Sequence, residues 1–196
     1  VPLAQQDPVL EHHADAQDAV PLFFPHNVRP FETRWPLPKN GKPTAFRACD
    51  GSEKLLVDAR NYVLLRRFSA KEEHRRLTAS SFLPGHSAWP ARIAIENHLN
   101  YIYLARRNLT EAETIGLTAI FNSALLDRYF RTLSGNTQVN ATEIRAMPFP
   151  SLEEIAQIGV AVKRLDLSNR AEVERTVLGE LGINGSIVRE LLRSGM

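Results

Sequence analysis

The chain of 196 residues has very little cysteine, and none of its apolar stretches is long and uninterrupted. Its single cysteine, Cys49, has no internal partner for a disulfide, so the fold does not depend on an oxidising compartment and a cytoplasmic location is expected. The longest apolar stretch, residues 115–130, is interrupted by Asn122 and Asp127, so we expect no membrane association. No signal segment opens the chain, and a first residue, Val1, that is not methionine favours a piece of a longer protein.

Patterns that carry catalysis are also missing. No glycine-rich cofactor loop follows a strand, and Gly179, Gly182 and Gly185 are better explained as ends of helices than as a nucleotide-binding fingerprint. The histidines are scattered and are assigned no role in proton transfer. We therefore predict no catalytic residue, no metal site and no cofactor site in this chain.

Basic residues, in contrast, are concentrated in one segment. Residues 60–107 carry nine Lys and Arg against three Asp and Glu, whereas the net charge of the whole chain is only +2. Eight of the nine are arginines, whose planar guanidinium suits phosphate oxygens and guanine edges. Pairing with the three local glutamates is the alternative, but it leaves six positive charges unmatched. The segment therefore predicts a polyanionic partner such as a nucleic acid.

Residues 134–140 read Ser-Gly-Asn-Thr-Gln-Val-Asn and form the most informative stretch. They place five hydrogen-bonding side chains and no carboxylate within seven residues. Asn and Gln can bind adenine through two hydrogen bonds in the major groove, and Ser and Thr can bind phosphates or bases. The alternative is a polar loop whose side chains satisfy their own backbone. We expect the preceding helix to end at Gly135 in left-handed geometry.

Strand signals dominate the first half of the chain. Residues 62–68 and 98–104 are rich in β-branched and aromatic side chains, and residues 77–82 favour the return strand of a hairpin. A short helix opened by Ser69 is an alternative for the connection, but a hairpin fits better. In the hairpin, the basic residues cluster around one exposed turn; these residues are Arg66, Arg67, Lys71, Arg75 and Arg76.

Helix signals dominate the second half. Capping boxes at Thr110 and Ser151 open helices that should run to about Leu133 and Leu165. Two further short helices are predicted, with caps at Asn169 and Ser186. The sequence thus predicts an α+β fold in which an antiparallel, strand-rich N-terminal half is followed by a helical C-terminal half.

Four separated motifs carry a resemblance to a known family. They are residues 61–77, 96–102, 120–131 and 134–143. In this order they resemble the C-terminal part of type II restriction–modification N6-adenine DNA methyltransferases, over residues 20–160. In that family an N-terminal domain binds S-adenosylmethionine and carries an Asn-Pro-Pro-Tyr-type motif that holds the flipped adenine. This chain has neither feature, so the resemblance implies the target recognition domain alone.

The resemblance also implies a division of the chain and a set of partners. Residues 1–20 would be a linker or disordered lead-in, residues 21–165 the DNA target recognition domain, and residues 166–196 a helical extension. The implied partners are double-stranded DNA and the N-terminal methyltransferase domain of the same parent, which would bind S-adenosylmethionine. The implied DNA-binding residues are Arg66, Arg67, Lys71, Arg75, Arg76, Asn136, Thr137, Gln138 and Asn140.

Three alternatives remain open at this point. The chain could be a stand-alone DNA specificity subunit that recruits a separate methyltransferase or nuclease chain. It could also be a structural scaffold that binds proteins. Within residues 134–140, Asn136 and Asn140 could cap the loop rather than contact DNA.

Overall fold

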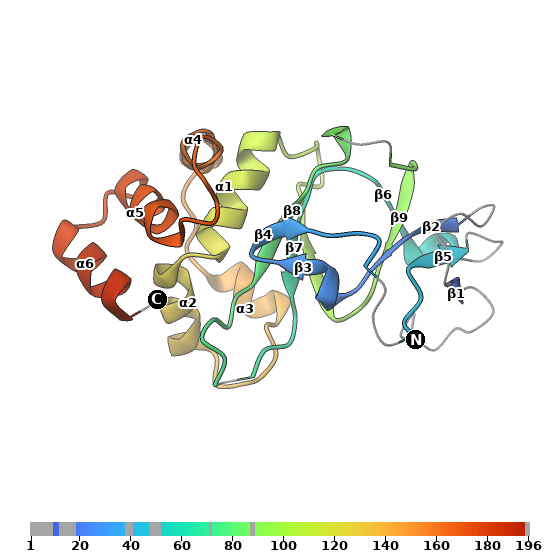
Figure 1. Cartoon of the computed structure of the whole chain (residues 1–196), viewed down its shortest axis with the longest axis horizontal. Helices are drawn as coiled ribbons and strands as arrows, with labels where there is room; N and C mark the ends of the chain where they lie inside the picture. The colour runs from blue at the N-terminus through green and yellow to red at the C-terminus, as the bar shows by residue number, and fades with distance from the viewer. Residues whose placement is uncertain are drawn as a thin grey trace.

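The computed structural model describes residues 10–11, 19–37, 41–47, 52–70, 72–86 and 89–194. Cys49 and Lys71 therefore lie outside the described residues. The molecule is elongated, with the helices gathered at one end and most strands toward the other (Figure 1). The predicted α+β fold, with strands in the N-terminal half and helices in the C-terminal half, is confirmed.

The strands form two five-stranded sheets. The first sheet has the order β1 (Leu10–Glu11), β5 (Ala45–Arg47), β2 (Ala19–Phe23), β9 (Arg92–Ile95) and β6 (Leu56–Asp58). The second has the order β10 (Leu99–Ile102), β7 (Tyr62–Arg66), β8 (Ala79–Phe82), β4 (Phe31–Thr33) and β3 (Val28–Arg29). Most pairs are antiparallel, but β2 with β9 and β4 with β8 are parallel. Strand β1 and the start of β2 fall within residues 1–20; the division into a lead-in, a domain and an extension stays a prediction.

The predicted hairpin is present as the antiparallel pair of β7 and β8. Tyr62 faces Phe82, and Leu65 faces Ala79, so the connection between the two strands spans residues 67–78. In its described residues this connection consists of turns, bends and one isolated bridge, without the short helix considered above. The third predicted strand is β10, which pairs with β7 and forms one edge of the second sheet.

Six α-helices follow in the described residues. They are α1 (Glu111–Phe121), α2 (Ala124–Leu133), α3 (Ala141–Ala146), α4 (Leu152–Val162), α5 (Arg170–Glu180) and α6 (Gly185–Ser194). The single helix expected from Thr110 to about Leu133 was wrong, because α1 and α2 are separate. The Asn122 side chain accepts from Ala79 N at 3.2 Å and donates to Ala79 O at 2.8 Å. This bond to β8 ends α1, and the Ser123 side chain then accepts from Leu126 N to begin α2.

The other helix ends agree in part with the predictions. The caps at Thr110, Ser151 and Asn169 are confirmed by side-chain bonds to the third residue beyond each. Ser186 is not a cap, because α6 already begins at Gly185. The expected left-handed glycine at the end of α2 was also wrong: Ser134 takes an extended conformation there, and in the described residues the glycines with positive φ are Gly41 and Gly182.

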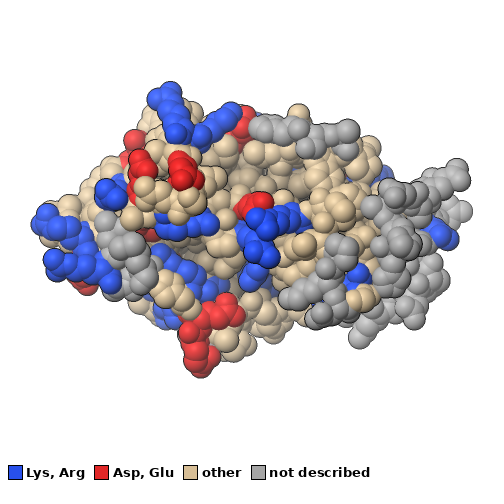
Figure 2. Space-filling view, in the orientation of Figure 1, with Lys and Arg blue, Asp and Glu red and all other residues tan. Residues whose placement is uncertain are grey.

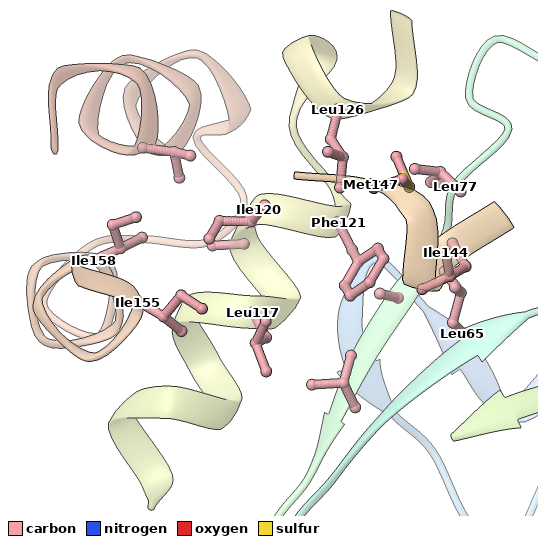
Figure 3. Packing of buried hydrophobic residues seen from close by; sticks show 14 of the residues in the cluster. Leu65, Leu77, Leu117, Ile120, Phe121, Leu126, Ile144, Met147, Ile155 and Ile158 are labelled. Carbon is pink, nitrogen blue, oxygen red and sulfur yellow. The ribbon is translucent and has the colours of Figure 1, made fainter. Parts of the chain in front are cut away.

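The larger core lies between one face of the second sheet and the helices (Figure 3). Leu65 and Leu77 pack near Ile144, while Leu117 and Ile120 of α1 lie toward α4. A smaller core lies on the other face of β7 and β8 and includes Tyr62, Phe82 and the partly buried Trp35 and Trp89. Both tryptophans therefore act as packing residues of this smaller core. No helix of the described residues is long and apolar enough to cross a bilayer.

Candidate nucleic-acid interface

Two segments that were singled out separately in the sequence lie side by side. We call residues 67–78 the basic connection and residues 134–140 the reader loop. An antiparallel bridge joins Phe68 to Gln138. Ser69 N donates to Thr137 O at 3.1 Å, and Val139 N donates to Arg67 O at 2.7 Å. Figure 1 shows the two chain segments adjacent at the lower edge of the molecule.

Arg76 joins the two segments through its side chain. Its Nε donates to Ser69 Oγ at 2.8 Å, and its Nη2 donates to the carbonyl oxygen of Asn136. The guanidinium carbon lies 5.5 Å from the centroid of the Phe130 ring. Because Arg76 is only 2% exposed, this geometry favours a role in positioning the reader loop. A contact between Arg76 and DNA stays an untested prediction.

Asp127 of α2 fixes the far end of the basic connection. Its Oδ1 accepts from the backbone amides of Arg76 at 2.6 Å and Leu77 at 2.9 Å, and its Oδ2 accepts from Arg131 Nε at 2.9 Å. Arg131 Nη2 donates in turn to Glu73 O at 2.7 Å. Sequence reasoning treated Asp127 only as an interruption of an apolar stretch. A lone carboxylate in a buried helix was the signal that could have revealed this role.

Arg66 and Arg75 are largely occupied by the fold. Arg66 Nε donates to Pro25 O at 3.1 Å, its Nη2 donates to Val28 O at 2.6 Å, and burial lowers its pKa. Arg75 Nη2 lies 3.9 Å from Glu174 Oε2, and burial raises the pKa of the Glu174 carboxyl. The Arg75 side chain remains 27% exposed, and both arginines are half-buried.

Of the predicted DNA-binding residues that the structure describes, the exposed ones belong to the reader loop. Asn136 and Thr137 are exposed, and Gln138 and Arg67 are half-buried. Asn140 is the N-cap residue of α3, and its backbone amide donates to Glu143 Oε2 at 3.0 Å, which supports the structural alternative for this residue. All nine predicted contacts stay predictions, and Lys71 lies outside the described residues.

Sequence reasoning missed Phe68 at this surface. Its side chain is 41% exposed, its ring centroid lies 5.0 Å from that of His98, and the Arg67 guanidinium carbon lies 6.0 Å from its centroid. An aromatic residue between a basic residue and a serine, at the end of a buried strand, was the signal in the sequence. An exposed ring whose backbone is held by the bridge to Gln138 is suited to apolar contact with a base.

The charge around the basic connection is mixed. Glu72 and Glu73 are exposed in the same connection, and Figure 2 shows acidic atoms at the lower edge of this face with basic atoms above them. The six unmatched charges counted in the sequence are therefore not one uniform patch. No group of three or more potential metal ligands occurs among the described residues.

The fold and this surface define a mixed α+β module with an amide-rich loop held against an arginine-containing connection. The chain is 36% identical over 170 residues to the type II methyltransferase M.PstI of Providencia stuartii. It is 33% identical over 169 residues to the type II methyltransferase M.BsuBI of Bacillus subtilis. These alignments cover 87% and 86% of this chain but only 32% and 33% of the relatives, so the chain spans about a third of their length. No family model matches the chain, and no solved structure matches it.

Proposed function

We propose that this chain is the target recognition region of a type II restriction–modification DNA methyltransferase. In this proposal it docks on double-stranded DNA and reads its sequence, while a separate N-terminal domain of the same parent transfers a methyl group from S-adenosylmethionine to adenine N6. The similarity to two type II methyltransferases over a third of their length supports a partial role of this kind. The location of the parent would be cytoplasmic.

The observation that carries the proposal is the backbone bridge between Phe68 and Gln138. An enzyme that extrudes its target base needs a second surface that grips the duplex. Contacts to phosphates set the position of such a surface, and contacts to base edges provide specificity. The bridge brings the backbone of Arg67, whose guanidinium is of a kind suited to phosphate, next to the reader loop, which carries amide and hydroxyl side chains.

The fixed backbone of the reader loop also supports the proposal. The reader loop is held by the Arg76 guanidinium on one side and by Asn100 on the other, whose Nδ2 donates to Val139 O at 2.7 Å. A loop whose backbone is already ordered loses less conformational entropy when it binds. The hydrogen-bonding groups of its exposed side chains can therefore bind a partner.

Binding to labelled duplex DNA across a salt series is the test of this proposal. We expect weak, mainly non-specific binding with a dissociation constant of about 10⁻⁴ to 10⁻⁶ M, which weakens steeply as salt is added. Arg67→Ala should lower the salt slope by about one, because one phosphate contact is lost. Arg175→Ala, which removes an exposed arginine of α5 at the helical end, is the matched control and should change nothing. Affinity that is independent of salt would contradict the proposal.

A further inference from the structure

A second surface that combines tyrosine and arginine lies at the other end of β10. Tyr101 and Tyr103 are 38% and 45% exposed, and their rings are stacked at 5.7 Å between centroids. The buried Tyr62 meets both rings edge-on, at 5.5 Å and 6.2 Å. The exposed pair is therefore supported from beneath by a fixed aromatic side chain, and its position does not depend on a partner.

Arg60 lies on this aromatic platform. Its guanidinium carbon is 4.6 Å from the centroid of Tyr103 and 5.7 Å from that of Tyr62. A guanidinium stacked on a ring keeps its N–H groups at the edge, where they can bind an oxyanion through two hydrogen bonds. Stacking on these two rings thus holds the side chain in place.

The platform forms one wall of a shallow groove that also contains Arg92 and Asp58. Arg92 is exposed and lies opposite Asp58 in the register of β9 and β6. Among the described residues, no Asp or Glu comes within ion-pair distance of Arg60 or Arg92, Asp58 included. The groove therefore carries two cations against one carboxylate, and its charge favours an anionic partner.

The groove and the candidate interface are connected by a single edge strand. Arg67 N donates to His98 O at 3.0 Å, and the strand continues from Leu99 to Ile102, after which Tyr103 follows. Five residue steps of extended chain from His98 to Tyr103 correspond to about 17 Å. This length is about five base-pair steps along one strand of DNA.

We infer that the groove formed by Arg60, Arg92 and Tyr103 is a second DNA-contact site, which binds the phosphate backbone that flanks the bases read by the reader loop. This inference rests on the proposed function. Tyrosine and arginine are also enriched in protein–protein interfaces. The unpaired arginines and the spacing along β10 favour the phosphate backbone of the same duplex.

The salt dependence of duplex binding tests this inference. On a duplex that extends well beyond the reader loop, Arg60→Ala and Arg92→Ala should each lower the salt slope by about one. Tyr103→Ala should weaken binding while leaving the slope unchanged, because it removes the platform and no charge; Tyr103→Phe should retain wild-type binding. Combining Arg60→Ala with Arg67→Ala should lower the slope by about two.

Each outcome has one meaning. If the unsubstituted chain binds duplex DNA with a steep salt slope but Arg60→Ala and Arg92→Ala leave that slope unchanged, the groove does not bind DNA, and the proposed function stands. If the unsubstituted chain shows no salt-dependent binding, the proposed function itself fails. Arg92 is exposed and at the surface, so Arg92→Ala gives an answer even if Arg60→Ala unfolds the protein. Thermal unfolding of each variant separates a loss of contact from a loss of fold.

Discussion

The guanidinium of Arg76 donates a hydrogen bond to the main-chain carbonyl of Asn136, a residue 60 positions further along the chain. The same guanidinium donates to Ser69, so one buried side chain links the basic connection to the reader loop. The sequence predicted Arg76 as a DNA contact, but its side chain is surrounded by the protein and bonded within the fold.

Arg76→Ala should lower the free energy of unfolding by about 2–4 kcal/mol, because a buried serine hydroxyl and a carbonyl lose their donor. Arg67→Ala is the matched control. Its side chain is half-buried and, within the part of the chain that the structure describes, donates to Asn97 O alone, at 3.2 Å, so we expect a change within about 0.5 kcal/mol. Urea unfolding of both variants measures the difference. Equal unfolding midpoints for the two variants would show that Arg76 has no special structural role.

Gly116→Ala should strongly destabilise the fold. A Cβ at Gly116 of α1 would overlap the carbonyl oxygen of Ile155 in α4, and a Cβ at Gly159 of α4 would overlap that of Ala112. Since both obstacles are backbone atoms, the two helices would have to separate, at a cost of at least about 1–3 kcal/mol. Thermal or urea unfolding measures the loss.

Gly179→Ala is the matched control for that experiment. Gly179 lies in α5, and a Cβ there would meet no atom within 4 Å. Alanine should therefore stabilise the helix by up to about 1 kcal/mol, because glycine is the poorer helix former. If both alanine variants change stability in the same direction, the close approach of α1 and α4 is not what excludes a side chain at residue 116.

Stability should depend on the charge of Glu113 at acidic pH. Arg107 Nη2 donates to Glu113 Oε1 at 2.6 Å, Thr110 N donates to Glu113 Oε2 at 2.8 Å, and the hydrogen bond from Arg107 lowers the pKa of Glu113 from 4.5 to about 2. A carboxyl whose pKa is lower in the folded state stabilises the fold above its ordinary pKa. That stabilisation is lost as the pH falls from about 4.5 toward about 2.

Glu113→Gln should therefore be less stable than the unsubstituted chain at neutral pH, and the difference should shrink as the pH falls through that window. Unfolding curves at a series of pH values measure it. Glu153→Gln, at an exposed position in the first turn of α4, is the control and should leave the stability at neutral pH close to that of the unsubstituted chain. A difference for Glu113→Gln that stays constant with pH would contradict the assignment of the low pKa to this carboxyl.

Gln138→Ala should reduce discrimination between DNA sequences if its amide reads a base edge. We expect a loss of about 1–3 kcal/mol for the cognate duplex and much less for a scrambled one. Arg67→Ala should weaken both duplexes about equally, because phosphate contacts carry no sequence information. Binding curves of the proposed parent methyltransferase with each duplex measure both effects. An unchanged ratio of cognate to scrambled affinity in a folded Gln138→Ala variant would show that the Gln138 amide does not read a base. The role of the loop would then be structural.

The predictable parts of the fold are those that depend on neighbouring residues. The caps at Thr110, Ser151 and Asn169 were predicted because a cap involves a side chain and an amide three residues away. The order of strands and helices follows from short-range patterns of the same kind. The break between α1 and α2 was missed, because it depends on a bond between Asn122 and Ala79 of β8.

The sequence shows which chemical groups the chain carries, but it does not show which of these groups are accessible to a partner. Composition and spacing are sufficient to find an arginine-rich segment and an amide-rich loop. The tertiary structure alone buries Arg76, exposes Phe68 and brings Gln138 beside it. Burial and pairing arise from contacts between residues far apart in the chain, and these contacts determine which charges are used within the fold and which remain for a partner.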